Sequence, residues 1–183
     1  MMNRLGRDFF CRPSIQVSKD ILGKFIAVGE NRGMVVETEA YIGPQDKASH
    51  AFGGKVTERN RVEYLEGGFV YIYLVYGMYW QLNITTDGKG YPGCFLIRAL
   101  DCGGDIKKTN GPGKLCRHLG LDNSFYGEDV AESGRIWFED SRNRYSIASS
   151  PRIGIDYAGP YWSRRKLRFY IKDYEKYLPM PTS

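Results

Sequence analysis

The sequence predicts an α+β fold in which a few short helices surround a curved antiparallel β-sheet. Two observations predict it: short apolar segments recur between Gly-, Asn- and Asp-containing turns, and long helical patterns are few. The chain has 183 residues, of which 42% are hydrophobic and 26% charged, as expected of one globular domain. Because no linker, repeat or low-complexity tract divides it, we predict a single compact domain over residues 1–183.

The predicted elements follow one another along the chain as short strands with three helical segments between them. Gly23 ends the first helix, Gly67 and Gly68 end the second, and Pro112 and Gly120 bracket the third. The predicted helices are 14–22, 57–65 and 113–119. The predicted strands are 25–28, 34–42, 69–76, 80–85, 95–100, 135–138, 152–155 and 167–171, with a polar turn at 30–33.

The chain is basic, with 26 Lys and Arg against 21 Asp and Glu and a net charge of +5. The surplus is concentrated in segment 142–172, where Asp156 is the acidic residue among many basic ones. Such a segment indicates either a phosphate-binding surface or an ordinary solvated face, and charge alone does not separate the two. The basic residues of this segment are Arg142, Arg144, Arg152, Arg164, Arg165, Lys166, Arg168 and Lys172.

Metal binding, membrane insertion and secretion have no signal in the sequence. The cysteines Cys11, Cys94, Cys102 and Cys116 form no C-x-x-C pair, and with two histidines in the chain we expect reduced thiols, no metal and no cofactor. The longest apolar stretch, 69–80, is shorter than the ~20 residues of a membrane span. The N-terminal residues lack the apolar run of a signal peptide, so we expect an intracellular protein.

Two carboxylates lie close together in the predicted strand 34–42. Strand alternation places Glu37, Glu39 and Tyr41 on one face, with neighbours about 6–7 Å apart. Two such carboxylates can act as acid and base in glycosidic cleavage, but spacing alone favours a face that meets water. His50 follows nine residues later in a loop that can fold back over this strand, although a lone histidine is more often structural.

The segment 71–80 alternates aromatic and aliphatic residues up to a glycine bend at Gly77. Tyr71 and Tyr73 fit an ordinary sheet core. Tyr76, Met78, Tyr79 and Trp80 gather at the bend, where a strand is expected to become polar. Large amphipathic side chains at a hairpin tip are typical of a wedge that enters a DNA base stack.

Several familiar catalytic motifs are absent. Segment 111–115 is not a P-loop, because Leu115 follows Lys114 and the first glycine of that motif is missing. Neither G-x-S-x-G nor H-E-x-x-H occurs in the chain. The sequence therefore gives no support to the nucleoside-triphosphatase, serine hydrolase and zinc protease families that these motifs define.

A series of segments, in order along nearly the whole chain, matches a known family. They are 4–10, 36–44, 46–50, 59–61, 71–73, 76–79, 83–84, 96–100, 111–115, 152–155 and 167–170. Together they resemble the alkyladenine (3-methyladenine or N-methylpurine) DNA glycosylase family. The segments V-E-T-E-A-Y at 36–41 and Y-I-Y-L-V-Y-G-M-Y at 71–79 are the most specific.

The resemblance implies a DNA repair enzyme that flips an alkylated or deaminated purine out of the duplex and hydrolyses its glycosidic bond. Glu39 matches the general base that activates water, and Arg98 matches its partner. The matching base-binding pocket consists of Tyr41, His50, Tyr73 and Asn83. No lysine matches a Schiff-base position, so a monofunctional enzyme that leaves an abasic site is implied.

The resemblance also implies how the protein holds duplex DNA that contains damaged purines. Tyr76 matches a residue that fills the gap left by the flipped nucleotide, with Met78 and Tyr79 beside it at the hairpin tip. The predicted contacts with the DNA backbone are Arg59, Lys114, Arg152 and Arg168. The family implies a monomer working with DNA in the cytoplasm or nucleus. The segment 101–110 is shorter than in longer members, which changes the expected footprint on that side.

Two further functions remain compatible with the residues. A non-catalytic nucleic-acid-binding module would share the basic, Tyr-rich surface, and a carbohydrate hydrolase would use Glu37 and Glu39 as its pair. Replacing Glu39 by Gln separates the first from a glycosylase, because only the enzyme loses a reaction. Replacing Glu37 by Gln separates the second, because only the hydrolase needs both carboxylates.

Overall fold

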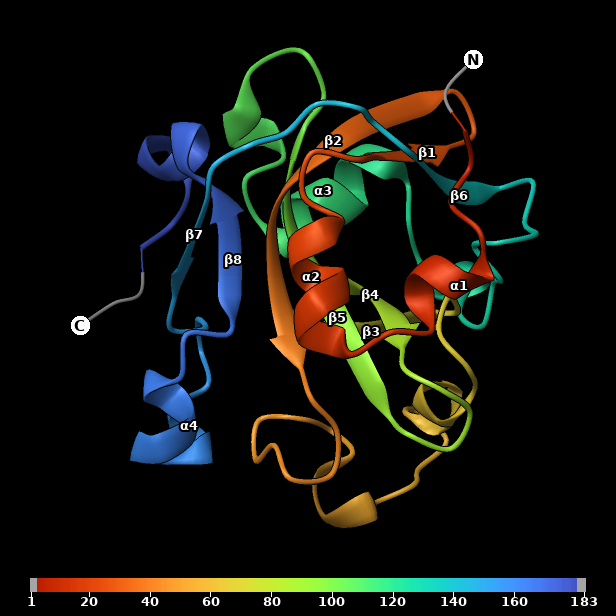
Figure 1. Cartoon of the computed structure of the whole chain (residues 1–183), viewed down its shortest axis with the longest axis vertical. Coiled ribbons are helices and arrows are strands. Elements are labelled where there is room, and N and C mark those ends of the chain that lie inside the picture. Colours follow the sequence, from red (N-terminus) through yellow and green to blue (C-terminus); the bar gives the residue numbers. More distant parts are fainter. Residues whose placement is uncertain (1–2, 181–183) are drawn as a thin grey trace.

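Eight antiparallel strands pair into one sheet in the computed structural model, which describes residues 3–180 (Figure 1). The main strand order is β3-β4-β5-β2-β1-β6, and β7 pairs with β8, which in turn pairs with β2. The strands are β1 (Phe25–Val28), β2 (Asn31–Tyr41), β3 (Val70–Val75), β4 (Tyr79–Thr86), β5 (Gly93–Asp101), β6 (Ile136–Glu139), β7 (Ile147–Ser150) and β8 (Arg168–Ile171).

Short helices complete the domain. They are α1 (Arg7–Phe10), α2 (Ser14–Asp20), α3 (Pro112–Leu119) and α4 (Pro160–Arg164). The helix α2 packs on β2 and β5 (Figure 1). There the Thr38 hydroxyl donates a hydrogen bond of 2.8 Å to the Ser18 carbonyl. The helix α3 packs on β4 and β5 and begins with Pro112, whose missing N–H costs a helix nothing at its first position. Among residues 3–180, no helix has both the length and the hydropathy of a membrane span.

The predicted α+β class is confirmed, and most predicted strands occur within two or three residues of their expected limits. The predicted strand 152–155 is wrong, because β7 lies earlier and residues 152–155 form a loop. The predicted helix 57–65 is a single 3₁₀ turn, Arg61–Tyr64. The chain limits 1 and 183 of the predicted domain lie outside the described residues.

The central strand β2 pairs with three neighbours, which explains why its middle is fully buried. Its first half pairs with β1, its second half with β8, and its other edge with β5. Two register shifts flank Glu37, so that Glu37 pairs with Ala99 and Thr38 with Ile97. Arg98 is therefore the extra residue of a bulge, a feature that redirects side chains and is common beside active sites.

Candidate active site

A cavity of 770 Å³ is lined by residues of β2, β3, β4 and β5 and by the start of α3. Nearly all the predicted site residues of these elements contribute to its walls. Its lining includes Glu39, Tyr41, His50, Arg59, Tyr73, Tyr76, Tyr79, Arg98, Lys114, Ile153 and Tyr157. The sequence thus places catalytic, aromatic and basic residues from distant segments around one pocket.

Glu39 lies at the inner wall of this cavity, and its relative solvent exposure is 0%. Its Oε1 accepts a hydrogen bond of 2.8 Å from the Ile153 backbone N–H, and its Oε2 accepts one of 3.0 Å from the Tyr41 hydroxyl. Arg98 Nη1 lies 3.4 Å from Oε1. Burial, followed by the Glu39 charge, raises the pKa of Tyr41 well above its usual value, so the phenol remains a donor. The carboxylate is therefore fixed in orientation and paired with a cation.

Arg98 connects the two glutamates of β2. Its Nε donates to Glu37 Oε1 at 3.1 Å while its Nη1 faces Glu39. Arg168 Nε donates to the same Glu37 oxygen at 2.5 Å. Glu37 and Glu39 are both fully buried, so the prediction that this face of the strand meets water is wrong. The reason is the pair of arginines, which lets two carboxylates occupy a buried position.

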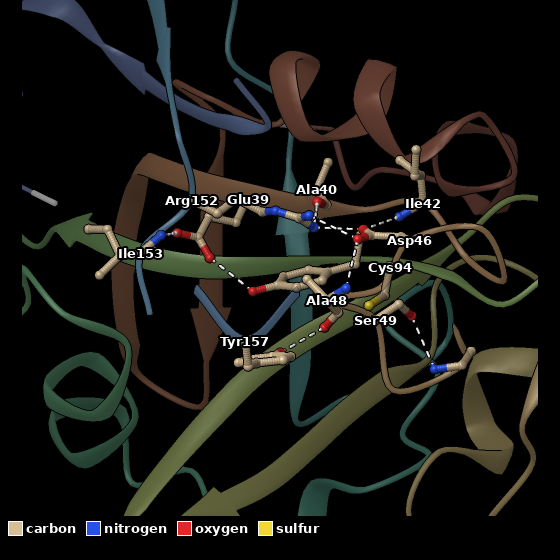
Figure 2. A network of polar contacts seen from close by, with 12 residues as sticks. Glu39, Ala40, Ile42, Asp46, Ala48, Ser49, Cys94, Arg152, Ile153 and Tyr157 are labelled. Carbon is tan, nitrogen blue, oxygen red and sulfur yellow. Dashed lines mark hydrogen bonds and ion pairs between the residues drawn. The ribbon is translucent and has the colours of Figure 1, made fainter. Parts of the chain in front are cut away.

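A second buried ion pair fixes the loops on either side of Glu39 (Figure 2). Asp46 accepts backbone hydrogen bonds from Ile42 and Ala48, which closes the loop that leads to His50. Arg152 donates to both Asp46 oxygens, at 2.6 and 2.9 Å, and to the Ala40 carbonyl at 2.9 Å. Arg152 directly precedes Ile153, so this ion pair also positions the Ile153 backbone N–H that donates to Glu39.

Aromatic rings form part of the pocket walls. The rings of His50 and Tyr73 have centroids 4.8 Å apart, and the Arg152 guanidinium lies 4.7 Å from the centroid of the Tyr41 ring. Desolvation by the surrounding protein lowers the pKa of His50, and Arg59 adds to this effect, so the imidazole is neutral at pH 7. Asn83 lies deeper, 1% exposed, in the wall of a smaller cavity below the rings.

The tip of the β3–β4 hairpin projects from the rim of the cavity. Tyr76 is 87% exposed and Met78 62%, while Tyr79 is 40% exposed and packs against Gly113, where an added Cβ would lie 2.8 Å from its ring. Tyr76 has φ +52°, a left-handed conformation that is unfavourable for a residue with a Cβ. The Met78 N–H donates to the Val75 carbonyl and closes the turn.

The four predicted backbone contacts divide into two groups. Arg59 and Lys114 are exposed beside the cavity, so they stay predictions for phosphate binding. Arg152 and Arg168 are 3% and 1% exposed, and their guanidinium groups are engaged by Asp46 and Glu37. The prediction that these two arginines contact DNA phosphates is therefore corrected: they neutralise buried carboxylates inside the protein.

Sequence reasoning missed three contributors to the site. Ile153 supplies a backbone donor, which leaves no trace in side-chain chemistry. Asp46 was noted only as part of a matching segment, and its role depends on Arg152, which is 106 residues away. Tyr157 lies at the cavity wall, and its hydroxyl donates to the Ala48 carbonyl at 3.1 Å. Within residues 3–180, no group of three His, Cys, Asp or Glu side chains is placed to hold a metal.

Comparisons with known proteins agree with this geometry. The family model described as "Methylpurine-DNA glycosylase (MPG)" matches residues 8–175. A relative from Clostridium novyi is 41% identical over 94% of this chain and 96% of its own length. The "DNA-3-methyladenine glycosylase" of Mus musculus is 37% identical over 92% of this chain and 59% of its own, and that of Homo sapiens is 33% identical over 93% and 66%.

A buried, oriented carboxylate in an aromatic pocket, together with these matches, defines the class: the protein is a DNA repair glycosylase, a hydrolase of N-glycosyl bonds. Within that class, the chain belongs to the methylpurine-DNA glycosylase family.

Proposed function

We propose that this protein removes alkylated or deaminated purines from duplex DNA and leaves an abasic site without cutting the strand. The observation that carries the proposal is Glu39, a carboxylate held by Ile153, Tyr41 and Arg98 at the wall of a pocket sized for a nucleotide. The relatives named for 3-methyladenine support the purine class. We further propose that the protein acts as a monomer, inside the cell, wherever DNA is accessible.

The first step is extrusion of the damaged nucleotide, because the glycosidic bond is out of reach inside stacked DNA. The exposed Tyr76 ring occupies the gap that the purine leaves, with Met78 and Tyr79 on the same tip. The flipped purine then stacks between Tyr41 and the rings of His50 and Tyr73. Alkylated purines carry positive charge or are electron-poor, and such rings bind well to the electron-rich face of tyrosine.

The second step is hydrolysis. Glu39 Oε2 accepts the Tyr41 hydroxyl and retains a lone pair with which to accept a proton from water. The water oxygen forms a bond to C1′ of the sugar, the bond from C1′ to the purine nitrogen breaks, and the base leaves with the electron pair. The carboxylate also stabilises positive charge on the sugar in the transition state. Arg98 pairs with that carboxylate and holds it in one orientation, with Nη1 3.4 Å from Oε1.

The lysine in the cavity lining supports the monofunctional assignment. Lys114 Nζ donates to the Lys107 carbonyl at 3.0 Å and to Asn110 Oδ1 at 2.8 Å, so its amine is engaged by two acceptors. A Schiff base needs a deprotonated amine directed at the sugar carbon. The carbohydrate hydrolase loses support as well, because Glu37 is buried between Arg98 and Arg168 and is not part of the lining of the 770 Å³ cavity.

The proposal is tested by incubating the purified protein with duplexes that carry one alkylated purine or one hypoxanthine. Alkali then cleaves any abasic site, and the products are separated by length. We expect cleavage only after alkali, in the presence of EDTA as in its absence. Strand cleavage without alkali would contradict the monofunctional assignment. Tight, salt-sensitive binding without base release would favour the binding module.

A further inference from the structure

A cavity of 40 Å³ lies at the inner end of the aromatic pocket, and the buried side chain of Glu63 forms part of its wall. It shares Tyr41, His50 and Tyr73 with the larger cavity, while Asn83 and Cys94 in its wall are buried. The small cavity is therefore the floor of the pocket. Its volume accommodates at most a few water molecules or the edge of an inserted ring.

Glu63 reaches this floor from a 3₁₀ turn next to the sheet and is 1% exposed. Its backbone N–H donates to the Asn60 carbonyl at 2.9 Å. Its Oε1 accepts a hydrogen bond of 3.4 Å from the Cys94 thiol. Its Oε2 is buried and has no hydrogen-bond partner among residues 3–180. Because buried polar atoms are almost always satisfied, this atom needs a partner from the cavity, either water or a bound base.

The protonation state decides what kind of partner Oε2 requires. Burial raises the pKa of Glu63 to about 8, even though the hydrogen bond from Cys94 acts in the opposite direction. At neutral pH the carboxyl group thus carries a proton. Burial also raises the pKa of Cys94, so the thiol keeps its hydrogen and occupies Oε1 as an acceptor. The proton of the carboxyl group then lies on Oε2, which is a donor.

We propose that the Glu63 hydroxyl is a hydrogen-bond donor at the floor of the base-binding pocket, and that it favours purines presenting an acceptor atom to that floor, directly or through one water. This inference rests on the proposed function, since it assumes that a purine enters the pocket. A base that turned a methyl or N–H group toward Oε2 would leave a buried donor unpaired, and sites of this kind reject such ligands strongly. Glu63 is then a residue that determines specificity, while Glu39 performs the reaction.

The test compares binding of duplexes that carry hypoxanthine with duplexes whose analogue lacks one acceptor. The first analogue, 3-deazahypoxanthine, lacks N3. The second, 7-deazahypoxanthine, lacks N7, and the third, purine, lacks O6. Binding is measured in a Glu39→Gln background, so that the base stays attached. With Glu63 present, we expect loss of the acceptor that faces the floor to weaken binding about fivefold. In Glu63→Leu that penalty should disappear, and the penalties for the other two analogues should remain.

Glu63→Gln is the matched control, because its amide retains an N–H donor and should retain the penalty. If Glu63→Leu does not fold, as judged by a thermal melt, Glu63→Met provides the same comparison. The proposal would be overturned if removing an acceptor from the base weakened binding equally in the protein with Glu63 and in the variant with the apolar residue, or weakened it in neither. Base release by the protein with Glu39 intact is measured separately. If that protein released no base, the proposed function would be contradicted. The role of Glu63 is decided by the binding measurements alone.

Discussion

The inner wall of the pocket and the tip of the β3–β4 hairpin differ in almost every physical property. At the wall, Glu39 has no exposed surface and is held by Arg98 and other fixed donors. At the tip, Tyr76 is 87% exposed and has a strained backbone. The wall can hold a charge in one orientation, as hydrolysis requires. The tip offers exposed apolar area, which DNA distortion requires.

The comparison is tested most strongly at Glu39. Glu39→Gln keeps the shape of the side chain but cannot accept a proton from water, so base release should fall about 10³-fold. Binding of damaged duplex should change little, because the hairpin tip and rim are untouched. Single-turnover release measured by alkali cleavage, beside a binding titration, gives both values. A variant that still released bases at more than a tenth of the original rate would remove Glu39 from the reaction.

The next effect concerns stability. Arg168→Ala leaves Glu37 with one cation in place of two inside the protein, and breaking such a buried pair costs about 3–5 kcal/mol. Arg164→Ala changes an exposed arginine of the same basic segment and should cost less than about 0.5 kcal/mol. Urea unfolding of the three proteins measures both. If Arg168→Ala instead kept full stability and lowered only the salt dependence of DNA binding, the guanidinium would be a phosphate ligand after all.

Glu63 gives the wall a pH dependence that the hairpin tip lacks. Its folded-state pKa of about 8 lies above the ordinary 4.5, so its contribution to stability is complete below pH 4.5 and is lost as the pH rises toward 8. Glu63→Gln removes this titration, since an amide stays neutral. The variant should gain about 2–4 kcal/mol relative to the original protein between pH 5 and pH 8. If the difference in unfolding free energy between the variant and the original protein were the same at pH 5 and at pH 8, Glu63 would not be protonated in the folded protein.

At the hairpin tip, Tyr76→Ala should weaken excision from duplex about tenfold, because about 1.4 kcal/mol of stacking is lost. Tyr76→Phe keeps the ring and serves as the control. Tyr76→Gly loses the ring too, but it relieves the φ of +52° and should raise the free energy of unfolding by about 1 kcal/mol. A Gly variant that is more stable but excises bases more slowly would show that the strained backbone at the tip serves to expose the Tyr76 ring.

The tip was predictable from the local sequence, whereas the burial and the ion pairs behind the wall were not. The hairpin is a local structure, and its alternating residues and Gly77 place the aromatic side chains without reference to the rest of the chain. The wall depends on long-range pairs. Segment 142–172 shows an excess of positive charge, but the burial of Arg168 follows from Glu37, which is 131 residues away. The bulge that redirects Arg98 likewise arises from pairing between β2 and β5.

The smallest expected effect distinguishes the rim from the rest of the surface. Lys114 and Arg59 are exposed at the cavity, so replacing either by Ala should lower the slope of log K against log salt by about one and weaken binding equally for damaged and undamaged duplex. Lys89 lies beyond the opposite end of β4 from the hairpin tip, and Lys89→Ala should leave the slope unchanged. Titrations of a labelled duplex at several salt concentrations measure the slope. An unchanged slope in both rim variants would mean that the phosphates run elsewhere, and the exposed arginines and lysines of segment 142–172 would then be the next residues to replace.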